Sequence, residues 1–187
     1  MYQKSTQNAQ IMRLSYGRTP LKYSFSLLQF EKKGLSQQLL HNLKYKGQEQ
    51  IGSFMGNWLG KQILEKFNTL PFDAIVIVPV SKRTLKKRGY NQVAKFGHKL
   101  SKTLQVPVAK NLLLKENGRT SSVFLSKLAR AAKPAHFYLN PKAVRTDYKH
   151  ILLVDDLITT GATLEACAKE LLKIPDVSLS FASIAVV

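Results

Sequence analysis

The stretch ILLVDDLITTGATLEACAKELL, residues 151–172, decides the fold of this chain. It opens with an apolar run typical of a strand buried on both faces, and the run ends at two adjacent acids, Asp155 and Asp156. A turn rich in threonine and glycine follows, after which apolar residues return at helical spacing, including Leu164 and Leu171. The stretch predicts a strand, a turn and a helix, which form either a plain connection or a ligand site.

The turn has the composition of a phosphate site. Unpaired N–H groups and the dipole at the start of a helix attract anions, and threonine hydroxyls add hydrogen-bond donors. The residues concerned are Thr159, Thr160, Gly161, Ala162 and Thr163. Asp155 and Asp156 would repel a phosphate, but carboxylates accept hydrogen bonds from vicinal hydroxyls and help to hold a divalent cation. A ribose 5-phosphate satisfies both requirements, whereas the sequence lacks the Gly-Lys-Ser/Thr of a P-loop.

The rest of the chain predicts an α/β fold. Apolar spacing predicts two helices within residues 35–67 and another within residues 91–104. Strands are predicted at residues 73–80, 111–114, 136–139, 151–154 and 177–187. This order favours a largely parallel central sheet flanked by helices, and ligands bind such sheets beyond the carboxyl ends of the strands.

Positive charge is concentrated in the middle of the chain. The sequence has 29 Lys and Arg residues against 11 Asp and Glu, which gives a formal net charge of +18. Sixteen of the basic residues lie between Ala74 and Thr146, where Glu116 is the one acid. Such a segment suits an anionic partner, either nucleic acid or a polyphosphorylated small molecule. A surface that merely keeps the protein in solution stays open as the alternative.

Composition also indicates the compartment. No apolar run approaches the roughly 20 residues that cross a bilayer, and residues 1–20 lack the apolar core of a secretory signal. We therefore expect a cytoplasmic protein without membrane insertion. The single cysteine, Cys167, excludes an intrachain disulfide and a multi-cysteine zinc site, and its predicted helix makes it a core residue.

The segment ILLVDDLITTGAT resembles the phosphoribosyl pyrophosphate (PRPP) signature of type I phosphoribosyltransferases, in which a hydrophobic strand, two acids and Thr-Thr-Gly-x-Thr follow one another. Within that superfamily, VPVSKRTLKKRGYNQ and LLHNLKYKG resemble the competence protein F (ComF) family, many members of which carry the name amidophosphoribosyltransferase. The resemblance covers residues 25–187. It implies a type I phosphoribosyltransferase-like fold with an N-terminal arm (1–22), an N-terminal helical hood segment (23–68) and a phosphoribosyltransferase core (69–187).

The resemblance also implies site residues. Asp155 and Asp156 would contact the ribose hydroxyls and, indirectly, magnesium bound to PRPP, while residues 159–163 would wrap the 5-phosphate. The two acids and Arg88 would be the catalytic residues. The pyrophosphate loop would contain Ser81, Lys82, Arg83, Lys87, Arg88 and Asn91.

Two basic segments fit this assignment. Arginine binds phosphate through two parallel hydrogen bonds, so the cluster at residues 82–88 suits pyrophosphate, although a bare charge run is more often a solvated face or a nucleic-acid patch. A flexible loop that covers PRPP is expected around residues 116–137, where Arg119 and Lys127 supply basic side chains.

The implied reaction is transfer of phosphoribosyl from PRPP to an unidentified nitrogen acceptor with release of pyrophosphate, through an oxocarbenium-like transition state. Magnesium would share the neutralisation of the leaving group with the basic loop. The chain lacks the cysteine-rich zinc module of many ComF-like proteins, and an acceptor pocket is expected around His41, Lys44 and Tyr45.

Two other functions stay open. One is a non-catalytic protein of DNA uptake and natural transformation that binds single-stranded DNA, and the other is a regulator that senses PRPP. The candidate partners besides PRPP are therefore single-stranded DNA, proteins of the competence machinery and a second copy of the chain as a homodimer.

Overall fold

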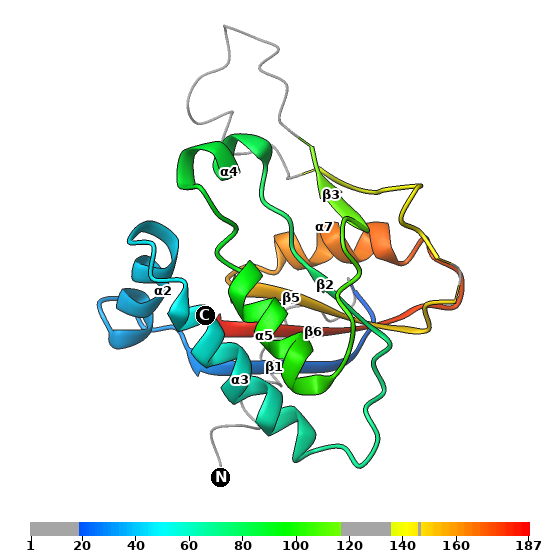
Figure 1. The fold of residues 1–187 in the computed structure, drawn as a ribbon, viewed down its shortest axis with the longest axis horizontal. Helices are drawn as coiled ribbons and strands as arrows, with labels where there is room; N and C mark the ends of the chain where they lie inside the picture. Colours follow the sequence, from blue (N-terminus) through cyan, green and yellow to red (C-terminus); the bar gives the residue numbers. More distant parts are fainter. Residues whose placement is uncertain (1–18, 117–135, 146) are drawn as a thin grey trace, which may run out of the picture.

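The central sheet consists of four parallel strands in the order β1-β6-β5-β2 (Figure 1). The computed structural model describes residues 19–116, 136–145 and 147–187. The strands are β1 (Leu21–Gln29), β2 (Ala74–Ile77), β5 (His150–Ile158) and β6 (Ser178–Val186). The predicted α/β class with a largely parallel central sheet is confirmed.

Strand β1 is absent from the elements that the sequence analysis predicts. It begins at Leu21 and pairs with β6 as far as Gln29 opposite Val186, so the proposed boundary between an arm and a helical hood segment falls inside a strand. Alternation of Tyr23 and Phe25 with the small residues beside them is the period-two signal that would have found it. The rest of the proposed domain division stays a prediction.

Helices cover both faces of the sheet (Figure 1). One face carries α2 (Leu35–Tyr45), α3 (Gln50–Leu64) and α5 (Ala94–Leu104), and the other carries α7 (Ala162–Leu171). Strand β5 is buried from both sides: Leu152 and Val154 lie in the cluster with α3 and α5, whereas Ile151 and Leu153 lie in the cluster with α7. Burial on both faces explains why this strand is a continuous apolar run in the sequence.

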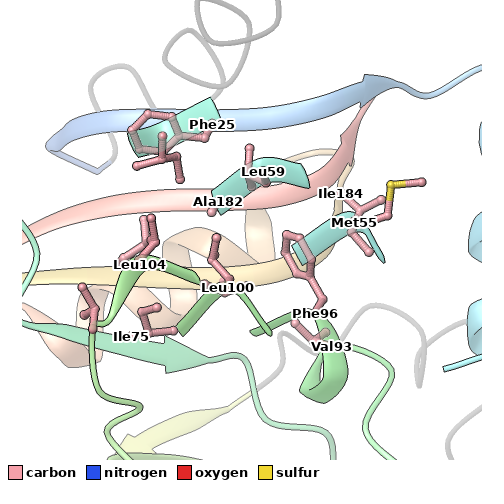
Figure 2. Close-up of a cluster of buried hydrophobic side chains, with 14 of the residues drawn as sticks. Phe25, Met55, Leu59, Ile75, Val93, Phe96, Leu100, Leu104, Ala182 and Ile184 are labelled. Carbon is pink, nitrogen blue, oxygen red and sulfur yellow. The ribbon is translucent and has the colours of Figure 1, made fainter. Parts of the chain in front are cut away.

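The core on the α3 and α5 face depends on close contact between these two helices. Figure 2 shows Leu59 of α3 near Leu100 and Phe96 of α5, all of which are buried. A Cβ atom at Gly56 would lie 2.4 Å from the carbonyl oxygen of Phe96. Because no side chain fits there, glycine lets the two helix backbones meet and fixes α5 against the sheet.

A second, antiparallel sheet pairs β3 (Leu113–Lys115) with β4 (Phe137–Leu139), near the strand positions predicted from sequence. Beyond the ladder, the Glu116 backbone N–H donates to the His136 carbonyl over 2.9 Å. The expected flexible loop, with Arg119 and Lys127, runs between these two residues and lies outside the described residues.

Candidate functional site

The two adjacent acids lie within β5, which continues beyond them to Ile158. Asp155 lines a pocket on the α7 side of the sheet, whereas the carboxylate of Asp156 meets Lys44 of α2 on the other side. Strand geometry explains the division, because successive side chains point to opposite faces. The two carboxylates therefore have different surroundings, which the sequence analysis did not distinguish.

The threonine- and glycine-rich turn forms the rest of the pocket that Asp155 lines. Its lining consists of Asp155, residues 157–164 and Phe181, around a volume of about 50 Å³. That space holds a few water molecules or a group the size of a phosphate. The structure thus brings the first acid and all five predicted phosphate-loop residues to one place.

Backbone geometry at the turn suits an anion. Gly161 has a φ of 80°, in the left-handed region that favours glycine, and directly precedes α7. Gly161, the residue before the helix, provides no side-chain cap, and Thr160 Oγ1 only weakly accepts from the Ala162 N–H at 3.4 Å. The backbone N–H groups at the start of α7 are thus available to a phosphate.

Asp155 is a buried carboxyl with a perturbed pKa. Burial, together with the neighbouring Asp156 carboxylate, holds the pKa of Asp155 well above its usual range. Its Oδ1 accepts a hydrogen bond of 2.8 Å from the Asp156 backbone N–H. A protonated carboxyl at this position can donate a hydrogen bond to a hydroxyl as well as accept one.

The carboxylate of Asp156 forms an ion pair with a lysine from the N-terminal half of the chain. Lys44 Nζ lies 2.8 Å from Asp156 Oδ2, and apart from this ion pair that buried oxygen has no hydrogen-bond partner among the described residues. Asp156 is 4% exposed. Lys44 was expected near an acceptor pocket and not beside an acid, because nothing local in the sequence links the two residues.

The donor set fits magnesium only when a ligand carries the ion. Carboxylate oxygens are the ligands that magnesium prefers, and Asp155 and Asp156 offer them at the strand end. Within the described residues, however, no group of three or more His, Cys, Asp and Glu side chains could hold a metal. Magnesium beside these acids stays a prediction.

The segment predicted as a pyrophosphate loop begins with a short helix, α4 (Lys82–Arg88). Ser81 caps it by accepting from the Thr84 N–H over 3.1 Å, and Gly89 ends it with a φ of 85°. Residues 82–88 are therefore helical, with both cap signals present in the sequence, and their contact with pyrophosphate stays a prediction. Lys82, Arg83 and Lys87 are exposed on this helix.

Arg88 and Asn91 are engaged within the protein. The Arg88 guanidinium lies over the Tyr45 ring, 5.4 Å from its centroid, and donates to Gln92 Oε1. Asn91 Nδ2 donates to the Val78 carbonyl over 3.1 Å, which ties the start of α5 to the end of β2. Their contact with pyrophosphate stays a prediction.

The basic segment after β2 and the two acids of β5 lie at the same edge of the sheet. Strands β2 and β5 are parallel neighbours, and the Val78 N–H donates to the Val154 carbonyl over 2.9 Å, one residue before Asp155. Figure 1 shows α2 beside this edge, at the carboxyl end of β6. The site is thus assembled from β5, its following turn, the segment after β2 and the end of α2.

The chain is homologous to two curated bacterial proteins. It is 29% identical over 139 residues to DNA utilization protein YhgH of Escherichia coli, with 72% of this chain and 60% of that protein covered. It is 32% identical over 103 residues to competence protein F of Haemophilus influenzae, with 54% of this chain and 45% of that protein covered. No family model matches the chain.

A solved structure has the same fold. The crystal structure of an adenine phosphoribosyltransferase superposes with a TM-score of 0.50 at 17% identity, covering 79% of this chain and 75% of that one. The type I phosphoribosyltransferase-like fold and the resemblance to competence protein F are therefore confirmed. Among the described residues, no helix is long and apolar enough to span a membrane.

Proposed function

We propose that this homologue of YhgH and competence protein F binds PRPP and transfers its phosphoribosyl group to a nitrogen acceptor. The observation that carries the proposal is the pocket at the end of β5, where Asp155 and residues 159–163 converge. It offers phosphate donors on one side and a hydroxyl partner on the other. The phosphoribosyltransferase fold supports the proposal, because this edge of a parallel sheet is where ligands bind.

Each part of the site has a task in this reaction. Residues 159–163 hold the 5-phosphate, and the acids hold the ribose hydroxyls. The bond between ribose C1 and the pyrophosphate oxygen breaks, a bond from C1 to the acceptor nitrogen forms, and that nitrogen loses a proton. Pyrophosphate leaves with the electron pair of the broken bond, so positive charge close to it stabilises the transition state.

Basic side chains supply that charge. Lys82, Arg83 and Lys87 are exposed on α4, directly after β2, and can turn toward a pyrophosphate at the sheet edge. Arg88 would join them on release from Gln92. Bound magnesium, if present on PRPP, supplies further neutralisation of the leaving group.

Turnover tests the proposal. We expect the wild-type protein to release pyrophosphate from PRPP with magnesium in the presence of a suitable amine, and the Asp155→Asn/Asp156→Asn variant to lose this activity. Asp176→Asn is the matched control, because Asp176 is an exposed acid distant from the site. Unchanged turnover in the double variant would refute the assignment of the acids, and binding without turnover would indicate a PRPP sensor.

A second candidate function is binding of single-stranded DNA. The names of the relatives, DNA utilization protein and competence protein F, motivate it, and the outer surface of α3 and α5 favours it. There Phe54 and Trp58 are 65% and 41% exposed, with ring centroids 6.1 Å apart. Lys95 and Lys102 are exposed on the adjoining helix. Paired exposed aromatic rings suit stacked bases, and exposed lysines suit phosphates.

Oligothymidine binding at increasing salt tests this candidate. We expect binding that weakens steeply with ionic strength and that Phe54→Ser/Trp58→Ser reduces by roughly tenfold or more. Leu172→Ser is the matched control, since Leu172 is an exposed apolar residue just after α7, on the opposite face of the sheet. Absence of binding at low salt would eliminate the candidate.

We also propose that the protein is cytoplasmic, that it has partners among the competence proteins and that it forms a homodimer.

A further inference from the structure

Three consecutive residues at the end of α2 contact three separate parts of the candidate site. The Leu43 carbonyl accepts a hydrogen bond of 2.6 Å from the Tyr90 hydroxyl, and the Tyr45 ring lies under the Arg88 guanidinium. Between them, Lys44 reaches Asp156 on β5. The end of α2 is therefore fixed beside β5 by side chains from α4, the segment after it and β5.

The ion pair between Lys44 and Asp156 is poorly suited to a purely stabilising role. The two side chains are 23% and 6% exposed, so both charges lose much of their hydration. A pair of this kind gains little over apolar residues of the same size, because the desolvation cost offsets the attraction. Its position at the ligand-binding edge of the sheet instead points to a role in the site.

We propose that Lys44 is a positioning residue of the ribose site, which holds the Asp156 carboxylate fixed on the α2 side of β5. The proposal rests on the proposed function, because it assigns Lys44 to that same site. Asp156 then offers a ribose hydroxyl a fixed acceptor, while Asp155 faces the phosphate loop. A residue from the N-terminal half of the chain thereby completes a motif that is otherwise contiguous in the sequence.

Charge balance supports this assignment. Two carboxylates beside a phosphate site repel both each other and the ligand. Burial and Asp156 raise the pKa of Asp155, and Lys44 is the cation that acts against this shift. With Lys44 in place, the pair of acids presents at most one uncompensated negative charge to the incoming phosphate.

Calorimetric titration of ribose 5-phosphate into wild type, four single variants and one double variant tests the proposal. Lys44→Met removes the charge, and Lys44→Arg keeps it. Tyr90→Phe loosens the same end of α2 without touching the acids, and Asp156→Asn removes the partner. We expect Lys44→Met to weaken binding by about tenfold, as for a lost hydrogen bond to a charged group, and Lys44→Arg to restore most of the affinity.

Two further comparisons separate positioning from folding. Tyr90→Phe should weaken binding by less than about threefold, and Lys44→Met should have no added effect in the Asp156→Asn background. Equal losses in Lys44→Met and Tyr90→Phe, or an undiminished effect of Lys44→Met beside Asp156→Asn, would overturn the inference. Wild-type protein that binds neither ribose 5-phosphate nor PRPP would overturn the proposed function and this inference with it.

Discussion

The Tyr90 hydroxyl donates a hydrogen bond of 2.6 Å to the backbone carbonyl of Leu43, and this bond joins the segment after α4 to the last turn of α2. Tyr90 and Leu43 are far apart in the sequence, and each lies next to a residue assigned to the candidate site. The bond gives the hydroxyl of Tyr90 a partner that phenylalanine at this position would lack. Removing the hydroxyl leaves a carbonyl at the end of a helix without its partner.

Tyr90→Phe should therefore lower the free energy of unfolding by about 1 kcal/mol, the typical contribution of one hydrogen bond. Urea unfolding followed by circular dichroism measures this change. Tyr138→Phe is the matched control, because Tyr138 is 46% exposed on β4 and its ring faces solvent. Equal stability of Tyr90→Phe and wild type would show that water replaces the hydroxyl without cost.

Gly56→Ala should destabilise the protein although alanine favours helices. The helix propensity gain is about 1 kcal/mol, but the new Cβ would lie 2.4 Å from the Phe96 carbonyl oxygen and would force α3 and α5 apart. Overpacking of this kind costs about 1–3 kcal/mol, and contact with a rigid backbone favours the upper end. We expect a net loss in thermal unfolding, and a smaller loss for Gly52→Ala, whose nearest contact is 3.1 Å. A stabilised Gly56→Ala variant would contradict the packing described.

His150 should make stability fall in mild acid. Its ring stacks on Tyr23, and burial lowers its pKa, an effect that Lys22 reinforces and Asp73 opposes. Between the lowered folded pKa and the unfolded value of about 6.5, the unfolded chain binds more protons. The stability that His150 contributes is therefore fully present above the pKa of the unfolded state, and it is lost as pH falls through that window.

Unfolding free energy measured against pH checks this sign. The wild-type curve should decline below about pH 6.5, and His150→Gln should flatten that part of the curve. His98→Gln, at an exposed position of α5, serves as the histidine control. A His150→Gln curve with the wild-type slope would assign the acid sensitivity to carboxylates.

Cys167 should be inert in the folded protein. It is fully buried on α7, and burial raises the pKa of its thiol, so almost no thiolate reaches a reagent at neutral pH. We expect labelling by iodoacetamide to be roughly 100-fold or more slower in buffer than in denaturant. Because the chain has one cysteine, mass spectrometry reads the result directly. Fast labelling of native protein would show that α7 opens readily.

Much of the fold and the place of the candidate pocket could be predicted because the signals are local. β5 is buried on both faces and so appears as one apolar run, and the phosphate loop, residues 159–163, follows it directly in the chain. Cys167 was predicted to be a core residue, and this is confirmed. α4 was missed although Ser81 and Gly89 carry ordinary cap signals, because the charge run was interpreted as a ligand loop.

Long-range pairings account for the rest. Lys44 meets Asp156 only because α2 packs on one face of the sheet beside the end of β5, and no spacing in the sequence encodes that contact. Likewise, the different roles of Asp155 and Asp156 depend on which helix covers each face of the strand. Edge strand β1 was not predicted because a partly polar, alternating segment is a weaker signal than an apolar run.

The most direct test of the account is calorimetric titration of PRPP with magnesium into wild type and Asp155→Asn. We predict saturable binding to the wild type that Asp155→Asn weakens by at least about tenfold, because the variant loses a buried partner of the ribose hydroxyls, while Asp176→Asn binds as wild type does. Binding of equal strength to wild type and Asp155→Asn, or no binding to either, would contradict the claim that the end of β5 is a ribose-phosphate site.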